Sequence, residues 1–165
     1  MIIINVAQVT VFFLIVARLS GLFMFAPIFS DRRFFALGKI TLIIWLASLL
    51  VFVVPLPKIL PDTGITLGIA LVMEMLIGAL MGFVTDILIS GLEFCGTLMD
   101  TQAGLSVASL LDPAYGRQVT LFSYLLKWTS LMIFLILDGH HMILSALVQS
   151  FKILPPGIPL SALQV

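Results

Sequence analysis

The run from Ile65 to Gln102 constrains this chain most, because it carries a helical pattern without a single proline. At about 1.5 Å per residue, a helix of this length is longer than any bilayer requires. Its apolar sequence is interrupted by four acids, namely Glu74, Asp86, Glu93 and Asp100. We therefore predict one very long helix whose acidic positions need partners.

Three of these acids, Asp86, Glu93 and Asp100, are spaced by seven residues. On a helix they drift only about 20° per step and form one stripe. Gly78 and Gly82 form a small-xxx-small pair on the neighbouring face, where helix backbones can approach closely. Glu74 and Asp86, the two acids within Leu67–Leu88, raise the free energy of insertion into lipid by about 5–7 kcal/mol. The apolar residues of the same stretch lower it by a similar amount. The pattern predicts that sister subunits or pore water cover the stripe; pairing of the acids with backbone or helix ends is the alternative.

Composition is typical of an integral membrane protein, with 61% hydrophobic residues, 10% charged residues and a mean hydropathy of +1.26. Eight Lys and Arg balance eight Asp and Glu, so no basic patch predicts a nucleic-acid partner. Cys95 is the sole cysteine, which excludes an intrachain disulfide and a metal site built on several thiolates. The fold class that we predict is all-α and of the membrane type.

About five helices are predicted in all. Besides Ile65–Gln102, the apolar runs that predict them are Ile3–Phe29, Ile40–Val54, Val119–Leu137 and Met142–Leu154. Ile40–Val54 spans only about 22 Å, against roughly 30 Å for the hydrocarbon core of a bilayer. This helix is therefore short for a lone membrane span.

Arg18 is the anomaly of the first apolar run. A central arginine costs about 2.5–3.5 kcal/mol on insertion scales, so it should face a partner helix, a carboxylate or a cavity. Alternatively the helix is shifted along its axis, and Arg18 extends its side chain to the membrane interface. The sequence leaves both alternatives open.

Between the long helix and the next lies Asp100–Gln118, which combines small residues with leucines and valine and closes on Asp112-Pro113. It is too polar for a good membrane helix and too apolar for an ordinary solvated loop. Non-helical backbone at membrane depth persists only where protein buries it or a watery cavity receives it. We therefore predict a functional loop held inside a membrane assembly.

His140 and His141 are adjacent, so on a helix they point about 100° apart and cannot chelate one metal in the i, i+4 manner. We expect a helix-end histidine beside Asp138 and no metal or other cofactor. No Ser/His/Asp arrangement has motif spacing, and the phosphate-binding and dinucleotide-binding glycine motifs are absent from the sequence. The chain is not expected to be an enzyme.

Four pieces carry a resemblance to a known family: ARLSGLFMFAPIFSDR (Ala17–Arg32), EMLIGALMGF (Glu74–Phe83), CGTLMDTQAGLSVASLLDP (Cys95–Pro113) and FLILDGHHMILSALVQSFKILPPG (Phe134–Gly157). In this order the pieces resemble the FliR/SctT family of type III secretion export-gate subunits. The patterns GLS-x-AS-x-x-DP and GH-x-x-x-L-x-AL-x-x-SF-x-x-LP favour the flagellar branch over the virulence branch.

The resemblance implies a non-enzymatic subunit of a hetero-oligomeric helical cone, joined by FliP-, FliQ- and FlhB-like subunits. It implies a place in the flagellar basal body at the bacterial inner membrane, with much of the cone above the bilayer plane. Unfolded rod, hook and filament proteins would pass through the centre. Arg18, Glu74, Gly78, Gly82, Asp86, Glu93 and Asp100 would serve subunit contacts or the polar stripe.

The resemblance also assigns a role to the loop Gly104–Pro113, which is similar to the family's plug that closes the pore. Small residues would let it fold tightly, and apolar residues would seal a narrow aperture by packing and dewetting. Its residues are Gly104, Leu105, Ser106, Val107, Ala108, Ser109, Leu110, Leu111, Asp112 and Pro113. The alternative is a buried loop that only joins two helices.

Two departures from the family pattern stand out. Phe34-Phe35 occupies a place where the family usually has a proline, and the chain ends at Val165 where the family continues into a FliQ-like helical hairpin. We expect residues 1–157 to form a single FliR-like region and 158–165 to be a tail, with that hairpin absent. A truncated product, one half of a split subunit and a natural short variant all remain open.

Two rival functions remain beside the export gate. A small proton- or ion-coupled transporter would use Arg18, Glu74 and the acidic stripe as relay groups. It predicts inverted repeats, and the two halves show no convincing similarity. A virulence-type homologue or a non-functional fragment is the other alternative.

Overall fold

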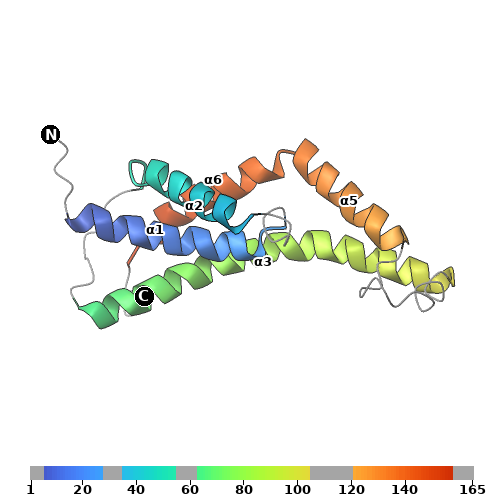
Figure 1. Ribbon diagram of the computed structural model, residues 1–165, viewed down its shortest axis with the longest axis horizontal. Coiled ribbons are helices and arrows are strands. Elements are labelled where there is room, and N and C mark those ends of the chain that lie inside the picture. Colours follow the sequence, from blue (N-terminus) through green and yellow to red (C-terminus); the bar gives the residue numbers. More distant parts are fainter. Residues whose placement is uncertain (1–5, 28–34, 55–62, 105–120, 158–165) are drawn as a thin grey trace. The chain divides into compact units, whose positions relative to one another are not determined.

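The computed structural model describes residues 6–27, 35–54, 63–104 and 121–157 (Figure 1). These residues form five helices and no strand: α1 (Val6–Phe25), α2 (Ala36–Leu50), α3 (Gly64–Gln102), α5 (Leu121–Ile136) and α6 (Gly139–Ile153). The predicted all-α fold with one very long helix is confirmed, because α3 has 39 residues.

Helix boundaries follow the sequence prediction closely for α3 and less closely elsewhere. The structure ends α1 at Phe25 instead of Phe29 and α2 at Leu50 instead of Val54. The start of α2 at Ala36 is earlier than the predicted Ile40, because Gly38 continues the helix instead of preceding it. The start of α6 at Gly139 is earlier than the predicted Met142. Asp138, the residue just before it, adopts the left-handed conformation with φ 54°, so Gly139 can begin the next helix.

The chain divides into two compact units, Met1–Phe83 with Met142–Val165 and Val84–His141. We call them the first and the second unit. The predicted single FliR-like region over residues 1–157 stays a prediction.

The core of the first unit is built around α1. Fully buried side chains recur along this helix at helical spacing, and Ala47 of α2 with Leu147 and Phe151 of α6 pack against them. The buried apolar residues of α1 are Val11, Leu14, Ile15, Leu19, Leu22 and Phe23. Because Arg18 lies on the buried face of α1, this cation must find its partners inside the protein.

Much apolar surface stays exposed on the other helices. Leu37 of α2, Ile65 of α3 and Ile136 of α5 are 76%, 76% and 79% exposed. Surfaces of this kind indicate contact with lipid or with other proteins. By length and composition, two helices could cross a membrane, Gln8–Phe25 within α1 and Gly64–Gln102, with a third if α5 and α6 form one broken span.

Candidate functional site

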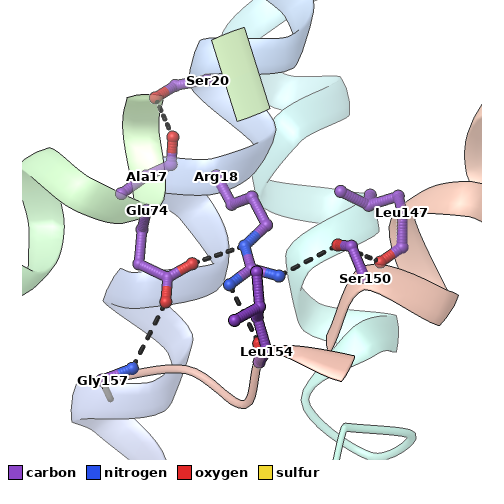
Figure 2. A network of polar contacts seen from close by, with 8 residues as sticks. All are labelled: Ala17, Arg18, Ser20, Glu74, Leu147, Ser150, Leu154 and Gly157. Atoms are coloured by element: carbon purple, nitrogen blue, oxygen red, sulfur yellow. Dashed lines mark hydrogen bonds and ion pairs between the residues drawn. The ribbon is translucent and has the colours of Figure 1, made fainter. Parts of the chain in front are cut away.

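Arg18 lies in the middle of α1 and is completely buried. Its Nε donates to Oε2 of Glu74 on α3, with the two atoms 2.5 Å apart (Figure 2). Glu74 is only 4% exposed. The two charges therefore neutralise each other in the interior, which is what a buried ion needs to be tolerated.

The rest of the Arg18 guanidinium is held by the end of α6. Nη1 donates to Ser150 Oγ at 2.9 Å, and Nη2 donates to the backbone oxygen of Leu154 at 3.1 Å (Figure 2). The guanidinium carbon also lies 4.1 Å from the centroid of the Phe151 ring, a cation–π distance. A cation at the carboxyl end of a helix is further favoured by the helix dipole.

The second carboxylate oxygen of Glu74 fixes the chain just beyond α6. Oε1 of Glu74 accepts a hydrogen bond from the backbone N–H of Gly157 at 3.3 Å. Pro155 and Pro156 stop the helix, and Gly157 adopts φ 84°, a conformation that favours glycine. We call Arg18, Glu74, Ser150, Leu154 and Gly157 the Arg18 network; it joins α1, α3 and the end of α6 within the first unit.

The structure thus places Arg18 fully buried against a carboxylate, which is the first of the two alternatives. Ser150, Leu154 and Gly157 were not singled out from the sequence. Ser150 is separated from Arg18 by 132 positions, and nothing in the local pattern connects them. The one available signal was the Pro-Pro-Gly stop after α6, which marks a helix end whose free backbone groups need partners.

Glycines let α1 and α3 approach each other beside the Arg18 network. A Cβ at Gly78 would lie 1.8 Å from the backbone oxygen of Arg18, and one at Gly21 would lie 2.1 Å from that of Met75. A Cβ at Gly82 would lie 2.5 Å from the backbone oxygen of Leu22. The close backbone approach predicted for Gly78 and Gly82 therefore occurs within the chain, against α1; their role in contacts between subunits stays a prediction.

Asp100 performs a related task in the second unit, near the end of α3. It is fully buried, and its carboxylate accepts hydrogen bonds from the backbone N–H groups of Phe122 at 3.1 Å and Ser123 at 3.0 Å. Both groups belong to the first turn of α5, whose free N–H groups and dipole favour an anion. We call this contact the loop clamp, because it holds together the two ends of the segment 103–120.

The other two acids of the stripe differ from Asp100. Glu93 pairs with Lys127 of α5 at 3.1 Å, and both side chains are partly exposed. Asp86 is half-buried, and Ser90 on its own helix donates to it at 3.4 Å. Asp100 therefore fits the alternative in which an acid of the stripe pairs with a helix end. Coverage of Asp86 and Glu93 by sister subunits or by pore water stays a prediction.

Gly104 is the only residue of the predicted plug that the structure describes, and it follows α3 with φ 72°. A non-glycine residue would be strained in this conformation. The other plug residues, 105–113, lie outside the described residues.

The sequence matches a known protein family. The family model of bacterial export proteins, family 1, matches residues 9–165. The chain belongs to this family. The match includes every residue of the Arg18 network and of the loop clamp.

The relatives that the chain resembles come from flagellar and secretion systems. The flagellar biosynthetic protein FliR of Bacillus subtilis is 27% identical over 86% of this chain and 54% of its own length. FliR of Pectobacterium carotovorum is 30% identical over 89% of this chain and 56% of its own length. The Yop proteins translocation protein T of Yersinia pestis is 32% identical over 84% of this chain and 53% of its own length. The chain thus spans about half the length of the curated relatives that it matches.

Proposed function

We propose that this chain is a structural and gating subunit of a type III protein export gate, acting in the flagellar system at the bacterial inner membrane. Its membership of the bacterial export family and its similarity to FliR proteins support the proposal. The large apolar side chains left exposed on α2, α3 and α5 agree with a subunit that other proteins cover. FliP-, FliQ- and FlhB-like subunits are the partners, and unfolded flagellar proteins are the cargo.

The observation that carries the proposal is the pairing of the buried charges. Arg18 and Glu74 bind each other and backbone groups, and Asp100 binds the first turn of α5. A proton- or ion-relay transporter needs ionisable groups that face water and change partners. Because these three side chains are engaged in structural hydrogen bonds, we propose that the chain is a scaffold around the export conduit. We propose no catalytic activity.

Co-purification tests the proposal directly. An untagged chain co-expressed with tagged FliP-like and FliQ-like subunits should be retained with them in detergent at a fixed ratio. Its exposed apolar faces make such association favourable. Recovery of the chain as a stable monomer, or as an oligomer of itself alone, would contradict the export-gate function and favour the transporter.

Within this function we propose that the segment Gly104–Pro113 is the plug of the gate. The loop clamp supports this role, because Asp100 fixes the base of the segment to α5 while the segment itself continues beyond Gly104. Leu105, Val107, Leu110 and Leu111 supply the apolar seal, which closes a narrow aperture by excluding water.

Deleting Leu105–Leu111, or replacing Asp100 with alanine, should make the assembled gate leak ions. The deletion removes the seal, and the alanine variant releases the base of the loop from α5. Membrane conductance in cells that overproduce the assembled subunits measures the leak, and both variants should exceed the wild type.

Thr101→Ala is the matched control, since Thr101 is the next residue of the same helix and its hydroxyl donates to the backbone oxygen of Leu98 on that helix. It should leave conductance at the wild-type level. Unchanged conductance in the Leu105–Leu111 deletion would rule out the plug, whereas the co-purification result would still stand for the subunit as a whole.

A further inference from the structure

The break between α5 and α6 gathers three side chains that can bind a metal. One ligand atom from each of Asp138, His140 and His141 lies within 4.8 Å of the others. The two imidazole rings have centroids 4.9 Å apart, and His140 Nε2 lies 4.0 Å from Asp138 Oδ1. We propose that these three residues form a binding site for a divalent transition metal ion of the zinc class.

The backbone of the break is what brings the three residues together. Asp138 adopts φ 54°, and its backbone oxygen accepts from the N–H of His141 at 2.9 Å, so residues 138–141 form a tight turn. A Cβ at Gly139 would lie 2.3 Å from Cε2 of the Phe134 ring, so the ring would have to shift to admit a larger residue there. The adjacent histidines thus converge through the turn, although they could not do so by the i, i+4 spacing of a regular helix.

The donor set suits zinc. Imidazole nitrogens and a carboxylate oxygen bind Zn²⁺ at about 2.0–2.2 Å, which places neighbouring ligand atoms roughly 3.3 Å apart in a tetrahedral site. Side-chain rotation can close the remaining gap, since the His140 and Asp138 side chains are 42% and 74% exposed. The same ligands would take Ni²⁺ or Cu²⁺, whereas Mg²⁺ and Ca²⁺ prefer sites made only of oxygen.

One further observation agrees with a metal site. His140 Nδ1 is buried and has no hydrogen-bond partner among the described residues, so no bond at this nitrogen holds the ring in its present orientation. The start of α6 carries a partial positive charge that opposes a cation, and the Asp138 carboxylate offsets it. Three protein ligands leave a coordination position open, which water or a side chain of another subunit can fill.

The test measures binding of Zn²⁺ alone to the full chain, purified in detergent without a polyhistidine tag. The chain has only two histidines, so no other imidazole competes. We expect one Zn²⁺ per chain by titration calorimetry, and His140→Asn and His141→Asn should each weaken binding by about tenfold or more, since even outer-shell losses reach this size. Co²⁺ bound at the same site should give the visible absorption of a low-coordinate ion, and each variant should lose it.

Cys95→Ser is the matched control, because Cys95 is the sole thiol and is exposed at a distance in sequence from the turn. It should bind Zn²⁺ as the wild type does. Absence of saturable binding at one ion per chain, binding unchanged in both histidine variants, or loss of binding in Cys95→Ser would overturn the site. The readout is metal affinity, so it stands independently of the export function.

Discussion

Replacing Arg18 with methionine is expected to lower the free energy of unfolding by about 3–5 kcal/mol, the usual loss when one partner of a buried ion pair is removed. The Glu74 carboxylate would stay buried without its counter-charge, and Ser150 Oγ and the Leu154 carbonyl would lose their donor. In a chain of this size the midpoint of thermal unfolding should fall by about 6–20 °C. Circular dichroism of the full chain in detergent measures it.

Two comparisons isolate the buried pair. Replacing Lys127 with methionine removes the partly exposed pair with Glu93 and should cost no more than about 1 kcal/mol. The double variant Arg18→Met, Glu74→Met should be less destabilised than the sum of its single variants, because no charge is left unpaired. If Arg18→Met shifted the midpoint no more than Lys127→Met, the Arg18 network would not be a structural anchor.

Replacing Gly78 with alanine is expected to have a second large effect. The new Cβ would lie 1.8 Å from the backbone oxygen of Arg18, so α1 and α3 would have to separate. Overpacking of this kind costs about 1–3 kcal/mol and more where backbone opposes backbone. Because the same separation would stretch the Arg18–Glu74 pair, we expect the cost to reach or exceed the top of that range. The unfolding midpoint and the amount of protein in membranes should both fall.

Gly68→Ala is the matched control on the same helix. No atom lies within 4 Å of a Cβ at Gly68, so the added methyl group meets open space. Alanine should stabilise the helix there by about 0.5–1 kcal/mol. Opposite signs for the two substitutions are therefore expected; equal effects would mean that the α1–α3 crossing does not depend on Gly78.

The helices themselves could be predicted from the sequence, because their signals are local. Long apolar runs, the absence of proline from 65 to 102 and the Pro-Pro-Gly stop at 155–157 mark their extent without reference to the rest of the chain. The prediction was wrong by a few residues at the starts of α2 and α6, where Gly38 and Gly139 are helical instead of breaking the helix.

The partners of the polar side chains could not be predicted in the same way. For Arg18 the sequence allowed either a buried carboxylate or an interface, and only the packing of α1 against α3 and α6 selects Glu74, Ser150 and Leu154. For Asp100 a sister subunit and a helix end were both open, and the position of the first turn of α5 selects the helix end.

The difference has a physical cause. Hydropathy and backbone preference act over a few residues, so the pattern of amino acids is sufficient to specify an all-helical membrane-type chain with an acid-bearing helix of unusual length. A buried charge is stabilised by groups within a few ångströms in space, and these come from positions as far as 136 residues away along the chain. Only the folded arrangement of α1, α3 and α6 brings such groups together and turns a costly arginine into the anchor of the first unit.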